Sequence, residues 1–279
     1  MKKSLAITLN LSAWILLILY LSFALHYTNR QKKERLCKGI NVTILDSAKR
    51  KFITPAMVKM WFETEKIKVI GEKLLSINTI ELEKFIGRRG YVRTVRVYTS
   101  MDGMLNIEIS QRRPIVRFNT QNGYNFYVTE DNYILPAQRH FVTYVPIVTG
   151  YVLPPFHRDY VGPLDSFAHS EEKKVEKSYL FLSKLINFVK FVDGDDFWRS
   201  FIVQINVEGG GAEQQYDPDI EIVPRAGNQV ILLGRVDGYQ EKLNKLLAFY
   251  KNAVAYEGWE KFRYINLQYK DQIVCIENK

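Results

Sequence analysis

The chain has 279 residues, a formal net charge of +9 and two cysteines. So few cysteines argue against a disulfide framework or a zinc site. We expect Cys37 and Cys275 to be unpaired, mostly buried thiols, and sequence alone leaves open whether they pair. The basic residues are interleaved with acidic ones and form no stripe with stacking aromatics, so we expect no nucleic-acid partner.

An apolar segment at the N-terminus is the first predicted element. From Leu5 to Leu25 there is no charged residue, proline or glycine. A run of this length can cross a bilayer as a helix, so we predict a short tail at 1–4 and a single transmembrane helix at 5–26. A cleaved signal peptide has a shorter apolar stretch. A buried core helix would not end in the polar run Asn29–Arg35.

Basic residues lie at both ends of the predicted membrane helix. Lys2 and Lys3 precede it, and Arg30–Arg35 follows it. The positive-inside bias therefore leaves the orientation open. The cluster at Arg30–Arg35 fits contact with anionic lipid headgroups, which makes membrane lipid an expected partner, or plain solvation.

Residues 38–112 predict one small module with the order β-α-α-β-β. A proline after a capping threonine predicts the first helix, and a capping box predicts the second. An Asp-Gly pair between two alternating segments predicts a hairpin. The predicted elements are strand Ile40–Ile44, helices that begin after Thr54 and Asn78, and strands Tyr91–Tyr98 and Met104–Ser110.

Residues 113–279 predict a larger mixed β domain with two packed helices, which makes the whole chain α+β. The first helix is capped by Ser170 and carries apolar residues at steps of three and four from Val175 to Val189. The second spans about 240–256. Strands are predicted at 124–128, 133–135, 201–207, 220–224 and 229–233, and a final strand at about Tyr264–Cys275.

No catalytic, cofactor-binding or metal-binding constellation is visible in the sequence. The four histidines are far apart, and no nucleophile elbow, zinc-protease helix or dinucleotide-binding turn occurs. The acidic run Asp193–Asp196 lacks the later ligands of a calcium loop, so a solvated helix-end turn is the favoured interpretation. His157 and Asp159 form an unsupported pair. We therefore predict a protein that is not an enzyme and carries no cofactor or metal.

Four segments in a shared order resemble the FtsQ/DivIB family of bacterial cell-division proteins. Gln111-Arg112-Arg113-Pro114-Ile115 is similar to the family's Glu-Arg-x-Pro-hydrophobic segment. The other three are similar to its hydrophobic-Pro-x-hydrophobic-x-Gly segment, its strand ending in Leu-Gly, and its Ile-Asp-Leu-Arg-Tyr strand. They are Val145–Gly150, Val230–Gly234 and Ile265–Tyr269.

The chain departs from the family pattern at several positions. Gln111 stands where the family has Glu, and Gln268 stands where it has Arg beside the tyrosine. The family's Pro-Trp-Val before the second strand is Gly90-Tyr91-Val92. The first turn of the second domain is Glu130-Asp131-Asn132, in which asparagine can take the left-handed conformation. These departures bear on partner contacts more than on the fold.

The resemblance implies a POTRA-like first module and a non-catalytic, membrane-anchored scaffold of the divisome. The scaffold would bind the small membrane proteins FtsB and FtsL and link them to septal peptidoglycan synthesis, with FtsK and the septal synthase FtsW/FtsI as further partners. It also implies a cytoplasmic tail, a single pass through the inner membrane and periplasmic domains at the division septum.

Strand addition at the C-terminal edge is the binding mode that this interpretation predicts, since an open edge leaves backbone groups unpaired. Apolar residues of one parity on the final strand are candidates for either core or interface. The predicted partner-binding residues are Ile265, Leu267, Tyr269, Lys270, Gln272 and Ile273.

Two other functions compete with the division scaffold. A POTRA-bearing accessory of protein export or outer-membrane assembly would share the first module, although such proteins usually carry several of these modules or a membrane barrel. A membrane-tethered hydrolase is disfavoured by the missing catalytic constellation.

Overall fold

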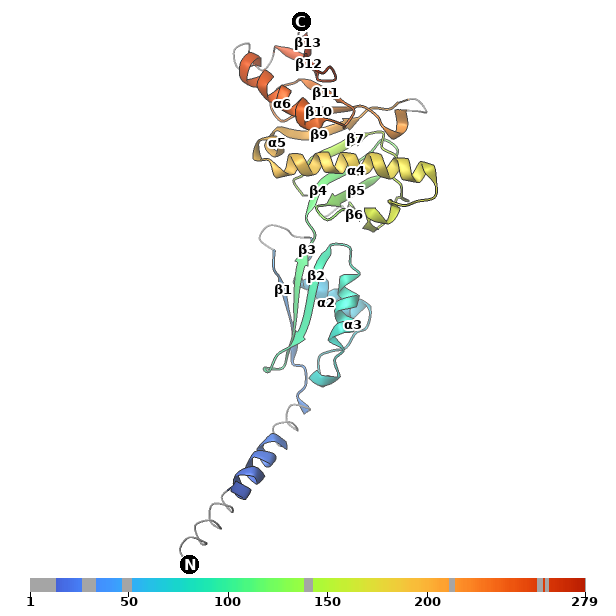
Figure 1. Cartoon of the computed structure of the whole chain (residues 1–279). Coiled ribbons are helices and arrows are strands. Elements are labelled where there is room, and N and C mark those ends of the chain that lie inside the picture. The colour runs from blue at the N-terminus through green and yellow to red at the C-terminus, as the bar shows by residue number, and fades with distance from the viewer. Residues whose placement is uncertain are drawn as a thin grey trace, which may run out of the picture. The chain divides into compact units, whose positions relative to one another are not determined.

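The computed structural model describes residues 14–26, 34–46, 52–137, 143–210, 214–254, 258 and 261–278. The chain divides into two compact units, Met1–Gln111 and Arg112–Lys279 (Figure 1). Each unit is described by itself below.

Residues 14–26 form a helix whose large apolar side chains are exposed. The tail predicted at 1–4 and the first part of the predicted transmembrane helix, residues 5–13, lie outside the described residues. Within the described ranges, no helix combines the length and the hydropathy needed to span a bilayer. The transmembrane helix therefore stays a prediction.

The first unit contains the predicted β-α-α-β-β module. A three-stranded sheet has the order β1-β3-β2, with β1 parallel and β2 antiparallel to the central β3. The elements are β1 (Gly39–Ile44), α2 (Pro55–Thr64), a 3-10 turn (Leu74–Ser76), α3 (Thr79–Gly87), β2 (Val92–Thr99) and β3 (Met104–Gln111).

Local sequence signals explain where these helices begin. The backbone N–H of Met57 donates to Thr54 Oγ1 at 3.3 Å, and Pro55 occupies the first turn, where its missing N–H costs nothing. The N–H of Glu81 donates to Asn78 Oδ1 at 3.1 Å. Both capping residues satisfy amides that the helix itself leaves unpaired, as the sequence predicts.

Gln111, at the end of β3, is fully buried and uses both ends of its amide. Its Oε1 accepts from the N–H of Ile53 at 2.7 Å, and its Nε2 donates to Asp46 Oδ1 at 3.0 Å. A carboxylate at position 111 could accept the hydrogen bond from the N–H of Ile53 but would repel the carboxylate of Asp46. The departure from the family's Glu thus has a physical reason, because the partner on one side is itself an acid.

The second unit is built on a ten-stranded mixed sheet with the order β13-β12-β11-β10-β9-β7-β4-β5-β6-β8. Three neighbouring pairs are parallel, β4–β7, β7–β9 and β11–β12, and the other six are antiparallel. The strands are β4 (Pro114–Asn119), β5 (Asn125–Thr129), β6 (Tyr133–Pro136), β7 (Ile147–Gly150), β8 (Gly162–Pro163), β9 (Ile202–Val207), β10 (Ile220–Pro224), β11 (Val230–Gly234), β12 (Phe262–Asn266) and β13 (Val274–Glu277).

Helices α4 (Lys173–Gly194) and α6 (Tyr239–Phe249) contribute to one continuous apolar core with the sheet, and α4 crosses the sheet (Figure 1). Leu182, Ile186 and Val189 of α4 are buried at helical spacing, as predicted. From α6, Leu243 and Leu246 are buried. The short helix α5 (Asp196–Phe201), which was not predicted, adds Trp198 and Phe201 to the same core.

Two details of the predicted second unit are wrong. The single strand expected at Tyr264–Cys275 is a pair of antiparallel strands, β12 and β13. The polar segment Gln268–Gln272 between them forms an exposed turn instead of continuing the ladder. The long helix begins at Lys173 rather than next to Ser170, whose Oγ accepts from the N–H of Glu172 at 3.3 Å.

Replacing Gln111 by Glu tests the role of the buried amide. At pH 7 we expect Gln111→Glu to lower the free energy of unfolding of the full chain in detergent by about 2–4 kcal/mol, because a donor is lost and two carboxylates face each other. Burial and the repulsion from Asp46 should raise the pKa of the new carboxyl group in the folded state. As the pH falls, a proton shared by the two carboxyl groups restores a hydrogen bond between them. The loss of unfolding free energy should therefore be smaller at low pH. Chemical denaturation at pH 7 and pH 4.5 measures both effects.

Gln272→Glu, an exposed position, is the control and should change the free energy of unfolding by less than about 0.5 kcal/mol. A Gln111→Glu variant as stable as the parent at pH 7 would contradict the proposed role of the buried amide.

Candidate partner-binding site

The two edges of the ten-stranded sheet differ in length and chemistry. At one end, β8 has two residues, and the second is Pro163, which has no N–H to donate. At the other end, β13 has four residues and no proline. Proteins commonly protect sheet edges with short strands and proline. By that criterion β8 is protected and β13 is open.

The side chains of β13 alternate between the core and solvent. Cys275 packs against the core, whereas Val274 and Ile276 are 43% and 57% exposed. They lie on the same face as Tyr264 and Asn266, their partners on β12. An edge strand that exposes two β-branched apolar residues is the kind of surface that a second strand covers.

The backbone of β13 has a hydrogen-bonding partner on one side only among the described strands. The N–H of Asn278 donates to the carbonyl of Lys261 at 2.8 Å, on the β12 side. Because successive amides of a strand point in opposite directions, the N–H groups of Cys275 and Glu277 point to the outer side. These groups could pair with an added strand without disturbing β12.

Lys245 of α6 holds the turn that presents β13. Its ammonium shares three N–H groups among the carbonyl oxygens of Leu267, Tyr269, Lys270 and Gln272. Burial lowers the pKa of Lys245, and the nearby carboxylate of Asp271 partly offsets this effect. The Lys245 side chain therefore ties together the backbone carbonyls between β12 and β13.

Gln268 fastens the start of the same turn. Its Nε2 donates to Asp219 Oδ2 at 2.8 Å, and its side chain lies against Gly234 at the end of β11. A Cβ at position 234 would come within 2.6 Å of Gln268 Cγ, and the backbone there has φ of +74°. The Leu-Gly ending of β11 thus leaves room for the turn that precedes β13.

The six predicted partner-binding residues fall into two groups. Ile265 and Leu267 are fully buried and Ile273 is half-buried against the core, so these three stabilise the domain. Tyr269 is 49% exposed, and Lys270 and Gln272 are also exposed, in the turn held by Lys245. The structure places this second group beside the open edge.

Val274 and Ile276 are the apolar edge residues that the sequence analysis missed. A single strand at about Tyr264–Cys275 does not include Ile276 and does not single out Val274 as an edge residue, whereas β13 exposes both. The alternation Val274-Cys275-Ile276-Glu277 was the available signal, since it has the pattern of a strand in its own right.

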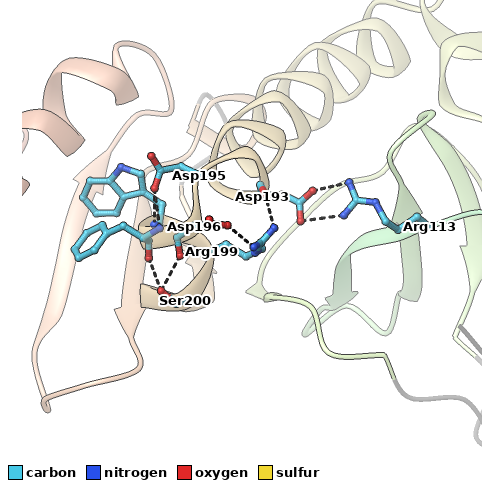
Figure 2. Close-up of polar contacts among 8 residues, drawn as sticks. Arg113, Asp193, Asp195, Asp196, Arg199 and Ser200 are labelled. Carbon is cyan, nitrogen blue, oxygen red and sulfur yellow. Dashed lines mark hydrogen bonds and ion pairs between the residues drawn. The ribbon is translucent and has the colours of Figure 1, made fainter. Parts of the chain in front are cut away.

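The acidic run Asp193–Asp196 serves the structure of α4 and α5 (Figure 2). Asp193 forms a bidentate pair with Arg113, with oxygen–nitrogen distances of 3.1 and 2.6 Å. Asp195 caps α5 by accepting from the N–H groups of Phe197 and Trp198, and Asp196 pairs with Arg199. The carboxylates of the run thus bond to protein groups, and no cluster with metal-ligand potential occurs in the described ranges.

The two arginines before β4 join separate parts of the second unit. Arg112 pairs with Asp131 and lies over the ring of Tyr133 at 3.7 Å. Arg113 Nε donates to Glu130 at 2.7 Å in addition to its pair with Asp193, and these carboxylates raise the pKa of its guanidinium. Asn132 in the same turn has φ of +56°, which confirms the left-handed conformation expected there. The Arg-Arg-Pro segment therefore has a structural role.

The remaining candidate groups show no catalytic arrangement. His157 Nδ1 and Asp159 Oδ2 are 3.6 Å apart, but the two side chains are 85% and 93% exposed, so nothing excludes water from the pair. Cys37 and Cys275 are both free, with Cys37 buried and Cys275 half-buried. Burial raises the pKa of the Cys275 thiol, which makes it a poor nucleophile.

Together, the two units define a class of protein in which a POTRA-like module precedes a mixed-sheet domain. Residues 35–110 match the family described as POTRA-like domain, and residues 113–276, more than half of the chain, match the family described as FtsQ/DivIB, C-terminal related. The chain belongs to the FtsQ/DivIB family. A search among curated proteins finds no match.

Membership in this family indicates a role in bacterial cell division at the septum. The members of the family are division proteins that are not enzymes.

Removing the ammonium of Lys245 tests whether it organises the candidate site. We expect Lys245→Met to loosen β12 and β13, because several carbonyls lose a shared donor, and to lower the free energy of unfolding by about 1–2 kcal/mol. Amide hydrogen exchange over residues 264–278 should accelerate by about tenfold, while exchange in β4 and β5 stays unchanged. Lys251→Met, at an exposed position just after α6, is the matched control. Equal exchange in the two variants would contradict the role of Lys245.

Proposed function

We propose that this protein is a non-catalytic, membrane-anchored scaffold of the bacterial divisome that recruits FtsB and FtsL through β13. The observation that carries this proposal is the open edge, where Val274 and Ile276 are exposed beside outward-pointing backbone amides. By binding these small membrane proteins, the scaffold would connect them to septal peptidoglycan synthesis.

Strand addition suits the chemistry of this edge. Each main-chain hydrogen bond contributes about 1 kcal/mol net, and covering an exposed valine or isoleucine contributes about 1 kcal/mol or more. A strand docked on β13 would therefore gain both terms without a preformed pocket. Tyr269, Lys270 and Gln272 would then contact the partner from the adjacent turn, while the buried Ile265 and Leu267 support the edge from beneath.

The anchor and the location belong to the same proposal. The apolar run from Leu5 to Leu25 would cross the inner membrane once, with residues 1–4 in the cytoplasm and both units in the periplasm at the septum. The exposed apolar side chains of residues 14–26 support a lipid environment for that part of the run. FtsK and the septal synthase FtsW/FtsI would be further partners in the assembled complex.

A POTRA-bearing accessory of protein export or outer-membrane assembly is the second candidate function, and the POTRA-like module is the observation that favours it. In the part of the chain that the structure describes, one such module is present. The match of the larger unit to the division family favours the scaffold.

Replacing Glu277 tests strand addition at β13. Glu277→Pro removes an outward-pointing N–H and leaves the β12 ladder intact, so we expect at least tenfold weaker binding of purified FtsB–FtsL, corresponding to about 1.4 kcal/mol. Glu277→Ala removes the same side chain but keeps the N–H, and it should bind within about threefold of the parent. Titration of the labelled partner complex against the full chain in detergent measures the affinity. Equal binding by the two variants would rule out backbone pairing at this edge.

Depletion in the host separates the two candidate functions. If the protein is a division scaffold, depleted cells grow as filaments without septa, because partner recruitment fails before septal wall synthesis. Microscopy with a membrane dye and a cell-wall label measures septum frequency. Normal septation accompanied by outer-membrane defects would instead support the accessory of export or assembly.

A further inference from the structure

Four large apolar side chains are exposed at one end of the POTRA-like module. Leu36 is 51% exposed, Ile70 62%, Leu75 70% and Met101 80%. They come from three segments: the stretch before β1, the loop between α2 and α3, and the hairpin between β2 and β3. We call these four residues the end patch.

Backbone contacts hold the first two segments together. Leu36 forms an isolated bridge with Lys73, the N–H of Leu74 donates to the carbonyl of Arg35 at 2.9 Å, and the N–H of Cys37 donates to the carbonyl of Glu72 at 2.8 Å. Leu36 and Leu75 are therefore exposed from two paired segments at the same end of the module.

The hairpin between β2 and β3 is bonded to the stretch before β1. Arg35 Nη1 donates to the carbonyl of Met101 at 2.7 Å, and the N–H of Lys38 donates to the carbonyl of Gly103 at 2.8 Å. In the module, the hairpin tip and the loop after α2 lie at the end where the chain enters (Figure 1). The N–H of Gly71, the residue after Ile70, donates to the carbonyl of Cys37 at 2.8 Å, so all three segments that carry the end patch are held together at this end of the module.

The covalent chain ties this end to the N-terminal apolar segment. Residues 27–33 separate the helix at 14–26 from Glu34, the first described residue of the module. Eight residue steps span at most about 29 Å when fully extended. If the N-terminal segment crosses a bilayer, this connection keeps the end patch close to the membrane surface.

We propose that the end patch binds the lipid surface, with Leu36, Ile70, Leu75 and Met101 entering the boundary between headgroups and acyl chains. This proposal rests on the membrane anchor of the proposed function. The charged residues next to the patch in the sequence nearly balance, with Arg35, Lys38, Lys68 and Lys73 against Glu34, Glu72 and Asp102. Apolar contact therefore drives the binding more than attraction to anionic lipid does.

Lipid is the occupant that the chain geometry favours, because the anchor holds the patch next to a bilayer whether or not any other protein is present. Contact with the membrane would restrict the orientation of the module about its linker. It would also remove the four exposed apolar side chains from water.

An environment-sensitive dye tests the proposal in the full chain. Leu75→Cys and Met101→Cys are made in a Cys275→Ser background, labelled with a nitrobenzoxadiazole maleimide and reconstituted in phosphatidylethanolamine–phosphatidylglycerol vesicles. Leu45→Cys is the matched control, since Leu45 is 63% exposed and follows the opposite end of β1. The chain without an added cysteine measures labelling of buried Cys37.

We expect the dye at positions 75 and 101 to emit at shorter wavelength than at position 45, and to be quenched at least twofold more by lipids with a nitroxide on the acyl chain. Emission at positions 75 and 101 that matches position 45 overturns the proposal. A signal that disappears when the vesicles hold one chain each also overturns it, because a second copy of the chain then covers the patch.

Alkaline extraction of the same vesicles separates this proposal from the anchor. If the chain stays in the membrane while the dye at position 75 emits as it does at position 45, the anchor is present and the end patch does not bind lipid. A chain that is extracted has no transmembrane anchor, which overturns both.

Discussion

Burial of one face of the ten-stranded sheet beneath α4 and α6 is the interaction on which the second unit depends. It assigns every strand an inner and an outer face, because side chains alternate along a strand. At β12 this places Ile265 inside and Tyr264 outside, and at β13 it places Cys275 inside and Ile276 outside. The candidate site is therefore a consequence of the core: the same packing that buries Ile265 turns the β-branched residues of β13 toward solvent.

Buried or partly buried polar side chains fix the points where regular structure stops. Gln111 joins the end of β3 to the segments around Asp46 and Ile53, and Lys245 gathers the carbonyls of the turn before β13. Without Gln111 the buried N–H of Ile53 would lack this partner, at a cost of about 1–3 kcal/mol. At Lys245 the ammonium draws together carbonyls of an exposed turn. In this chain these two side chains hold the backbone where β3 and β12 end.

Much of the architecture follows from local patterns in the sequence. The caps at Thr54 and Asn78, the hairpin at Asp102-Gly103 and the helical spacing of Leu182, Ile186 and Val189 are each determined within a few residues, and each is confirmed. The division of the C-terminal segment into β12 and β13 was not predicted. Its turn is held by Lys245, more than twenty residues earlier in the chain, and no local pattern reports such a contact.

The sequence by itself determined the β-α-α-β-β order of the first unit, the POTRA-like module, the family and the lack of a recognisable catalytic motif, because these depend on periodicity, turn residues and short motifs. Only the tertiary structure decided which residues form the surfaces. Ile265 and Leu267 became core, Val274 and Ile276 became the open edge, and Leu36, Leu75 and Met101 met at one end of the first module. The physical reason is that exposure depends on what packs against a residue, and those neighbours lie far away along the chain.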